Sequence, residues 1–391
     1  MTHESGMNPA QATAIIASRV FDGAMLHSTR AVLVRGGDVL GIATPADVPA
    51  DFQRVELPND ALLAPGFIDV QVNGGGGILL NDTPTPDAMA AIARVHRRFG
   101  TTGCLPTLIT DHPQAMVAAV GAARHGVGRP GVLGVHLEGP FLNPERAGVH
   151  RKDLIAVPTI ADLDVLSDLR GVGASQVTLA PERAPAGFIN GIAKLGVRIS
   201  AGHTNATHAQ MMAACDEGLT GITHLYNATS QLQAREPGVV GAALADRRIF
   251  AGVICDGIHV DPVTLGITHR AKGADRVMLV TDAMPSLGAN IDRFMLTGME
   301  IFVRDGKLTR GDGMLAGAHL DMASAVRNAV EFVGLKLTDA LAMASLTPAK
   351  FLGIDDKRGR IAPGYAADLV ALDGKLGVIG TWIAGGYAAA T

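Results

Sequence analysis

The sequence predicts an α/β protein, namely a (β/α)₈ barrel joined to a small β-sandwich that both ends of the chain build together. Eight apolar runs, mostly separated by helix-like segments, follow one another between Pro65 and Asp282, as in a closed barrel of parallel strands. Short β-like runs occupy both ends of the chain instead. The 48 glycines suit a fold with many tight turns between strands and helices.

The two ends of the chain carry the pattern of a small β domain. After a loose tail that reaches about Gln11, we expect strands in the runs ATAIIAS, RAVLVRGGDVLGIA and DFQRVELP. The glycine pair between Arg35 and Asp38 indicates a hairpin. The last segment, GRIAPGYAADLVALDGKLGVIGTWIAGG, again alternates short strands and turns. We therefore expect residues 1–63 and 355–391 to form one β-sandwich, with the barrel at 64–354.

The barrel strands are expected, in order, at GFIDVQV, GCLPTLI, VLGVHLEG, QVTLAPE, VRISAGH, GITHLYNA, FAGVICDG and VMLVTDA. Helical patterns lie between them, as in PDAMAAIARVHRRFG after the first run and PAGFINGIAKLG after the fourth. Beyond the eighth run, MEIFVRDGKLTR predicts a hairpin beside the barrel, and 318–333 and 337–344 predict helices. An open, doubly wound sheet is the alternative fold. The eight runs and the lack of a glycine-rich dinucleotide motif disfavour it.

Composition narrows the class of protein. Hydrophobic residues make up 48% of the 391 positions and charged residues 18%, which predicts a large core. The net charge of −4 and the lack of a basic stripe argue against nucleic acid as a partner. No apolar stretch is long enough to span a bilayer, and the N-terminus lacks the pattern of a signal peptide. Cys104, Cys215 and Cys255 lie in apolar runs, as buried thiols of a reducing compartment do. We expect a cytoplasmic protein.

Two histidines end neighbouring predicted strands. His203 closes VRISAGH, His224 lies in GITHLYNA, and a helical pattern at 207–217 separates them. Strand, helix and strand form a βαβ unit with parallel strands, so both imidazoles should lie at one edge of the sheet. Two converging imidazoles suit a metal ion. Two core histidines that only make hydrogen bonds are the alternative.

Other polar residues end the remaining strands, where barrel enzymes carry their chemistry. They are Gln71 and Asn73, Glu138, Glu182, Asp256 with His259 just after it, and Asp282. One carboxylate and two histidines at the ends of three strands make a three-ligand site, and a catalytic zinc typically has three protein ligands and an open position for water. Asp282 could then act as general base and acid. Structural salt bridges for Glu138 and Glu182, and a helix N-cap for Asp282, are the alternatives.

These motifs resemble the amidohydrolase superfamily and, within it, the N-acetylglucosamine-6-phosphate deacetylases. The similarity covers nearly the whole chain, from APGFID at 64–69 to PGYAADLV near the C-terminus. HLEGPF, AGHTNAT and THLYNA are specific to the deacetylases, and PGFID and ADLV are shared more widely. The resemblance implies hydrolysis of the acetamide of N-acetyl-D-glucosamine 6-phosphate to D-glucosamine 6-phosphate and acetate, in amino-sugar catabolism or recycling.

The resemblance also implies roles for individual residues. Glu138, His203 and His224 are implied metal ligands, Asp282 the catalytic acid and base, and His150 the group that polarises the acetamide carbonyl. A homodimer is implied, with Arg235 reaching the partner's site. Implied substrate-binding positions are Val149, His150, Asn227, Ala228, Arg235, Asp256, His259, Leu315, Ala316 and Gly317.

The sequence departs in two places from patterns common in the superfamily. Many members have His-x-His on the first strand, holding a second metal, where this chain has Gln71 and Asn73. Because neutral amides are poor ligands for transition metals, we expect one divalent ion per chain. Zinc is favoured, and Fe²⁺, Co²⁺ or Mn²⁺ would also suit a Glu/His₂ site. The second departure is Ala316, where other members often have serine, so any substrate contact there must come from the backbone.

Three functions stay open from the sequence alone. The first is a single-metal deacetylase of a phosphorylated N-acetylhexosamine, and the glucosamine and galactosamine epimers are not distinguished. The second is another amidohydrolase that acts on a small amide, which HLEGPF and the missing His-x-His disfavour. The third is a barrel that serves only as a binding scaffold. Such a scaffold would be expected to have lost one of Glu138, His203, His224 and Asp282, and this chain has all four.

Overall fold

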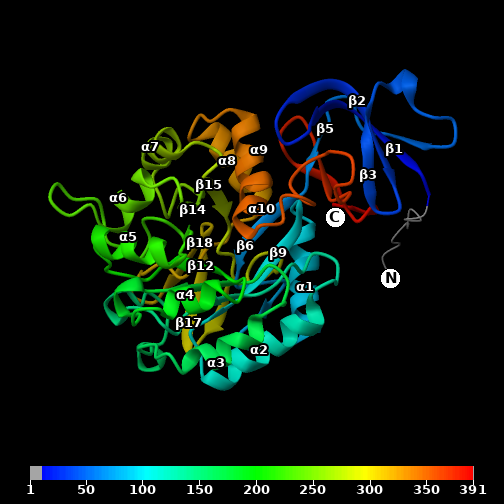
Figure 1. Cartoon of the computed structure of the whole chain (residues 1–391). Helices are drawn as coiled ribbons and strands as arrows, with labels where there is room; N and C mark the ends of the chain where they lie inside the picture. The colour runs from blue at the N-terminus through cyan, green and yellow to red at the C-terminus, as the bar shows by residue number, and fades with distance from the viewer. Residues whose placement is uncertain (1–10, 391) are drawn as a thin grey trace.

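The computed structural model describes residues 11–390, so the predicted N-terminal tail lies outside the described residues. A barrel of parallel strands wrapped by helices forms the larger body, and a β domain made from the blue and red ends of the chain lies beside it (Figure 1). The predicted fold class is confirmed. The predicted boundaries at 63/64 and 354/355 stay a prediction.

All eight predicted barrel strands form, in chain order around the sheet. They are β6 (Phe67–Val72), β9 (Thr101–Ile109), β10 (His136–Glu138), β11 (Gln176–Leu179), β12 (Arg198–Ala201), β13 (Gly221–Ile222), β14 (Phe250–Ile254) and β15 (Val277–Val280). Neighbours pair in parallel. A parallel bridge between Val72 and Ala283 brings the last strand back to the first. The carboxyl ends of all eight strands therefore meet at one mouth.

Helices follow the strands as the periodicity predicts. They are α1 (Pro86–Arg97), α2 (Pro113–Gly126), α3 (Asp162–Leu166), α4 (Phe188–Ala193), α5 (His208–Glu217), α6 (Gly238–Ala245), α7 (Pro262–Lys272), α8 (Met322–Glu331), α9 (Leu337–Ala344) and α10 (Leu346–Leu352). Short 3₁₀ turns lie at Pro45–Asp47, Pro144–Arg146, Lys152–Leu154, Ser167–Leu169 and Pro181–Arg183. Between residues 11 and 390, no helix is long and apolar enough to cross a membrane.

An insertion after β15 forms one strand more than the sequence predicted. The expected hairpin is present as β17 (Met299–Arg304) and β18 (Lys307–Arg310), and β16 (Arg293–Leu296) pairs antiparallel with β17. A two-stranded ribbon, β7 (Gly74–Gly75) with β8 (Ile78–Leu79), follows β6. Apolar side chains of the insertion pack against Leu79, Ile109 and Val149, so the insertion is fixed beside the barrel mouth.

The β domain combines both ends of the chain in one mixed sheet. Its strands are β1 (Thr13–Phe21), β2 (Leu26–Arg35), β3 (Asp38–Ala43), β4 (Gln53–Glu56), β5 (Leu62–Pro65), β19 (Leu369–Leu372), β20 (Val378–Ile383) and β21 (Gly386–Ala389). The predicted hairpin joins β2 to β3. Alternate residues of β1 face two separate apolar clusters, with Ile15 in one and Ile16 in the other, because successive side chains of a strand point to opposite faces.

Gly66 is the single residue between β5 of this sheet and β6 of the barrel. A Cβ atom at this position would lie 2.1 Å from Oγ1 of Thr102. Only glycine lets the chain pass so close to β9, which explains the position of this residue in the PGFID motif.

Candidate active site

A cavity of about 270 Å³ opens at the carboxyl ends of the barrel strands. Residues from the ends of β6, β9, β10, β12, β13, β14 and β15 line it, together with Met314, Leu315 and Gly317 from the loop after β18. The strand ends supply most of the polar groups, and the loop supplies apolar side chains. The cavity is therefore where the sequence predicted the chemistry of the barrel.

Glu138, His203 and His224 converge in this cavity. Nε2 of His203 lies 3.1 Å from Oε1 of Glu138 and 3.1 Å from Nε2 of His224, and His224 Nε2 lies 3.0 Å from the same carboxylate oxygen. All three side chains are buried. Ligands of one tetrahedral zinc ion lie about 3.4 Å apart, so these three atoms are spaced as ligands of a shared ion.

Hydrogen bonding favours a cation at this cluster. Nδ1 of His203 lies 2.7 Å from the carbonyl oxygen of Arg146, and because a carbonyl only accepts, Nδ1 carries the hydrogen. In a neutral imidazole, Nε2 then presents a lone pair to the Glu138 carboxylate and to His224. An orientation of this kind is typical of histidines that bind metals. The residues present thus fit one divalent cation, and an acidic ligand with two imidazoles suits Zn²⁺, Fe²⁺, Co²⁺ or Mn²⁺.

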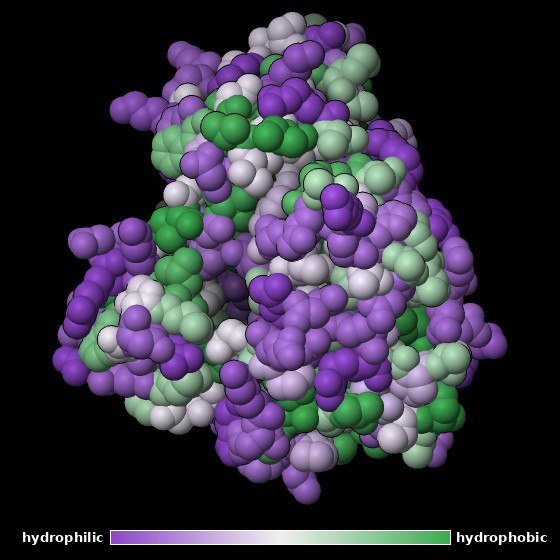
Figure 2. Space-filling view, turned by 90° about the vertical axis from the view of Figure 1, so that its left-hand side faces the viewer, coloured by the Kyte–Doolittle hydropathy of each residue, from purple (hydrophilic) through white to green (hydrophobic). Residues whose placement is uncertain are grey.

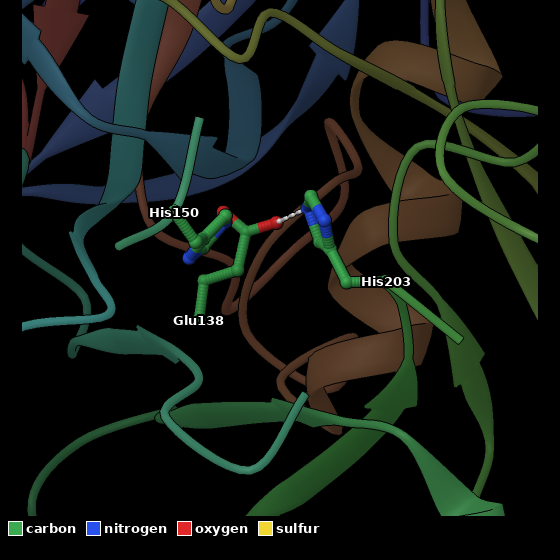
Figure 3. Close-up of side chains that lie close together, drawn as sticks. All are labelled: Glu138, His150 and His203. Atoms are coloured by element: carbon green, nitrogen blue, oxygen red, sulfur yellow. Dashed lines mark hydrogen bonds and ion pairs between the residues drawn. The ribbon is translucent and has the colours of Figure 1, made fainter. Parts of the chain in front are cut away.

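His150 also lies beside this cluster, and the centroid of its ring is 4.3 Å from that of the His203 ring. One potential ligand atom each from Glu138, His150 and His203 lies within 4.8 Å of the others, and Figure 3 shows the three side chains grouped around the Glu138 carboxylate. His224 nevertheless completes the tighter set, because its Nε2 is within 3.1 Å of both partners. We therefore favour His224 over His150 as the third ligand.

The contacts of His150 define its tautomer. The backbone N–H of Thr110 donates to His150 Nδ1 at 3.2 Å, and the Thr110 hydroxyl lies 2.8 Å from the same atom. An atom that accepts from N–H carries no hydrogen, so the hydrogen of the neutral ring is on Nε2. Burial, helped by the neighbouring His203, lowers the pKa of His150 to about 3. The ring is therefore neutral near pH 7 and has one N–H to donate.

Asp282 is held by the two amides that replace the His-x-His motif. Gln71 Nε2 donates to Asp282 Oδ1 at 3.1 Å and to Glu138 Oε2 at 3.2 Å, and Asn73 Nδ2 donates to the same Asp282 oxygen at 2.7 Å. Gln71 thus links the proposed base to a proposed metal ligand. The sequence assigned these amides only a negative role, the exclusion of a second metal. Their spacing of two residues on a strand could have indicated that both face the barrel interior.

Electrostatics couples these groups. Burial opposes ionisation of Glu138, but hydrogen bonds to His203 and His224 outweigh it and hold its pKa well below the usual range. Burial alone would lower the pKa of His224, yet the Glu138 carboxylate raises it to about 9. Burial, and after it the Glu138 charge, raises the pKa of Asp282 to about 6. A bound divalent cation would displace the proton from His224 and favour ionised Asp282.

The backbone turns sharply at three of these positions. His203 has a φ of 48°, His224 of 33° and Asp282 of 52°, and each lies two residues beyond the last residue of its strand. The left-handed conformation costs a non-glycine residue about 1–3 kcal/mol and is found mainly where function requires it. It is shared here by a predicted base and two predicted ligands, which supports a functional role for the strand ends.

Most predicted substrate-binding positions line the cavity, but three do not. Those that do are Val149, His150, Asn227, Ala228, His259, Leu315 and Gly317. Asn227 Nδ2 is buried and has no hydrogen-bond partner among residues 11–390, so it can donate to a substrate. Asp256 instead contacts His259, with 2.6 Å between its Oδ2 and His259 Nδ1. Ala316 is buried in the apolar cluster of the insertion.

Arg235, the third of these residues, lies on an exposed loop. Residues 231–236 between β13 and α6 are all exposed, and this loop projects from the body at the left of Figure 1. Figure 2 views the molecule from that side and shows small hydrophobic groups among hydrophilic residues, with a hollow between them. Arg235 does not line the cavity of its own chain, so any role in catalysis requires loop movement or a second copy.

Comparison with known proteins shows that the chain belongs to the amidohydrolase family, because the model of that family matches residues 62–388. Among similar proteins, N-acetylgalactosamine-6-phosphate deacetylase of Shewanella sp. is 41% identical over 91% of this chain and 90% of the relative. N-acetylglucosamine-6-phosphate deacetylase of Bos taurus is 40% identical over 93% of this chain and 92% of the relative.

A solved structure supports the same grouping. The crystal structure of N-acetylglucosamine-6-phosphate deacetylase from Pasteurella multocida is 35% identical, covers 97% of this chain and 100% of its own, and superposes with a TM-score of 0.93. Within the amidohydrolases, the chain therefore groups with the N-acetylhexosamine-6-phosphate deacetylases, as the sequence motifs indicated. The similarities do not separate the two epimer preferences.

Proposed function

We propose that this chain hydrolyses the acetamide of N-acetyl-D-glucosamine 6-phosphate to D-glucosamine 6-phosphate and acetate, as a cytoplasmic enzyme of amino-sugar catabolism or recycling. One observation carries the proposal: Glu138, His203 and His224 meet within 3.1 Å, and Gln71 links Glu138 to Asp282. A cation site beside a carboxylate that can exchange a proton suits the hydrolysis of an amide.

One divalent cation, most simply Zn²⁺, would be held by Glu138, His203 and His224. When bound, it would lower the pKa of a water molecule and polarise the amide carbonyl. Gln71 and Asn73 argue for a single ion, because neutral amides are poor ligands for transition metals and both amides are engaged in hydrogen bonds to Asp282.

Protein side chains carry out proton transfer and stabilise the developing negative charge. Asp282 accepts the proton of the attacking water and passes it to the amide nitrogen as the C–N bond breaks, so one water is consumed and the carboxylate is regenerated. Gln71 and Asn73 both hold Oδ1 and thereby orient the carboxylate. His150 Nε2–H donates to the carbonyl oxygen as negative charge develops there, a contribution that often dominates such reactions.

Substrate recognition is assigned to the rest of the cavity. Asn227 and Ala228 contact the sugar, and His259, oriented by Asp256, contacts the sugar or the phosphate. Arg235 has the planar, permanently charged fork that suits a phosphate. Because its loop is exposed, we propose that the enzyme is a homodimer and that Arg235 binds the phosphate of the substrate in the partner's cavity.

The galactosamine epimer is the second candidate substrate. The relative from Shewanella sp., named for N-acetylgalactosamine 6-phosphate, is 41% identical, and the bovine relative, named for the glucosamine epimer, is 40% identical. This difference is too small to choose between substrates that differ at one hydroxyl group.

The decisive experiment measures metal content and activity on one sample. Protein purified without added metal should contain about one divalent ion per chain, as expected of a three-ligand site. Release of acetate from both epimers of the phosphorylated substrate should stop on chelation and return with zinc. Two ions per chain would contradict the single-ion proposal. An ion without activity on either epimer would contradict the proposed reaction.

Cation affinity should depend on pH. His224 carries a proton below about pH 9 in the metal-free site, and the cation needs the neutral ring. Because binding releases this proton, the apparent affinity for zinc should fall as pH decreases, by up to about tenfold per unit below pH 9. Zinc titrations in competition with a chelator of known pH dependence, between pH 6 and 9, measure the slope. A flat profile would contradict a ligand role for His224.

Replacing Arg235 by alanine tests the phosphate contact. KM for the phosphorylated sugar should rise by more than about tenfold, since hydrogen bonds to charged groups contribute about 1.5–3 kcal/mol. KM for unphosphorylated N-acetylhexosamine should be unchanged. Arg304→Ala, at an exposed end of β17 outside the cavity, is the matched control. Equal effects of Arg235→Ala on both sugars would contradict phosphate binding.

A mixing experiment tests whether Arg235 acts across a dimer. Arg235→Ala and Asp282→Asn chains, unfolded and refolded together, should regain activity at low substrate concentration. In a mixed dimer, the chain with intact Asp282 would receive Arg235 from its partner. No gain over the sum of the two separate variants would mean that each chain uses its own Arg235.

A further inference from the structure

Glu182, a carboxylate at a strand end that has no role in the proposed reaction, lies between two loops of the active site. It belongs to the 3₁₀ turn Pro181–Arg183 directly after β11. Within residues 11–390 it forms no ion pair with an arginine or lysine, so the salt bridge considered from the sequence is not formed. Its two oxygens instead accept hydrogen bonds from Asn143, Thr204 and Asn205.

The bonds from Thr204 and Asn205 involve the segment that follows His203. Glu182 Oε1 accepts from the backbone N–H of Asn205 at 2.7 Å, and Oε2 accepts from the hydroxyl of Thr204. Thr204 is fully buried and directly follows the ligand. Bonds to an ionised acceptor are shorter and stronger than neutral ones, so Glu182 fixes the chain within two residues of His203.

The bond from Asn143 connects Glu182 to the turn that contacts the other side of the His203 imidazole. Asn143 Nδ2 donates to Glu182 Oε1 at 2.8 Å, while the backbone N–H of Asn143 donates to the carbonyl of His203 at 2.9 Å. Asn143 also accepts from the backbone of Arg146 at 2.9 Å, and the carbonyl of Arg146 is the partner of His203 Nδ1. Glu182 is therefore bonded both to the segment that carries His203 and to the turn that orients its ring.

We propose that Glu182 is a positioning residue that holds His203 in its ligand orientation by joining these two segments. The proposal rests on the metal site proposed above and is independent of which sugar is the substrate. Residues that orient a metal-binding histidine without touching the metal typically affect affinity about 10- to 100-fold when replaced. Because Glu182 does not line the cavity, its effect should be on cation binding and not on the acid–base step.

The test compares zinc affinity, by chelator competition far below the unfolding temperature, for wild type, Glu182→Ala, Glu182→Gln and Glu145→Ala. Glu145 is the matched control, because its carboxylate accepts from Asn205 Nδ2 at 2.8 Å at the exposed edge of the same network. We expect Glu182→Ala to lose about 10- to 100-fold in affinity. Glu182→Gln, which keeps one oxygen for Asn143 and Asn205, should lose less, and Glu145→Ala should match wild type.

A second measurement separates positioning from general stability. Thermal unfolding of the metal-free proteins reports the structural contribution, and kcat at saturating zinc should stay within a few-fold of wild type for Glu182→Ala. Wild-type zinc affinity in both Glu182 variants, with only a lower unfolding temperature, would overturn the proposal. So would an equal loss in Glu145→Ala. If Glu182→Ala does not fold, the zinc affinity of Glu182→Gln alone tests the proposal. Absence of zinc binding by the wild type would instead refute the metal site.

Discussion

Replacement of Asp282 by asparagine is expected to lower kcat by about 10²- to 10⁴-fold, the usual contribution of a general acid and base, while the cation stays bound. Gln71 and Asn73 both donate to Oδ1, so an asparagine would keep its oxygen there and place its NH₂ group at the position of Oδ2. The fold would be kept, but the group that accepts the proton would be lost. Steady-state kinetics and metal analysis of the same preparation measure both effects.

The control for this variant is Asp111→Asn. Asp111 follows β9 near the same end of the barrel, but its carboxylate accepts from Asn81 Nδ2 at 2.9 Å and does not line the cavity. Its replacement should leave kcat near the wild-type value. Near-normal turnover of Asp282→Asn would refute its role as base and acid. Loss of the cation together with activity would show instead that Asp282 is a ligand.

The positions of the barrel strands could be predicted because a buried strand is visible in the sequence as a short apolar run. Strands covered on both faces are continuous apolar runs, and each of the eight runs formed a strand. The strand β16 was missed because Arg293–Leu296 has only four residues, and two of them, Arg293 and Met295, are exposed. Its formation depends on pairing with β17, which is a property of the folded insertion.

The candidate ligands were predictable because a parallel barrel brings the ends of its strands together whatever lies between them. His203 and His224 could be placed at one edge from strand direction alone. The distance between the two imidazoles, their left-handed backbone conformations and the orientation of His203 by Arg146 could not be predicted. These features depend on how the loops pack.

Contacts between residues distant in sequence account for what was missed. Gln71 and Asp282 meet because barrel closure brings β6 beside the end of β15, although 211 positions separate them. His150 takes its tautomer from Thr110, 40 positions away. From the sequence, Glu182 was a candidate for a structural salt bridge, and only the fold shows that three hydrogen-bond donors surround it. The candidate residues at the strand ends could thus be named from the sequence, and the residues that form hydrogen bonds with them could not.

Replacement of Glu138 by glutamine should remove the cation and nearly all activity. Glu138 Oε1 faces both histidines and Oε2 accepts from Gln71. If the new amide turns its oxygen toward Gln71, its NH₂ points at the cation site. If the oxygen turns toward the site, the NH₂ opposes the NH₂ of Gln71. Because both orientations place donors against donors or a cation, zinc affinity should fall by more than about 100-fold, beyond the usual effect of an outer partner.

Zinc content after dialysis and affinity by chelator competition measure this loss, and the exposed Glu145→Gln should behave as wild type.

Two histidine variants then distinguish between His224 and His150 as the third metal ligand. His224→Ala should lose zinc as Glu138→Gln does, whereas His150→Ala should keep zinc and lose turnover, because His150 Nδ1 is engaged by Thr110 and only Nε2–H faces the reaction. The reverse result would make His150 the third ligand and leave His224 to polarise the carbonyl.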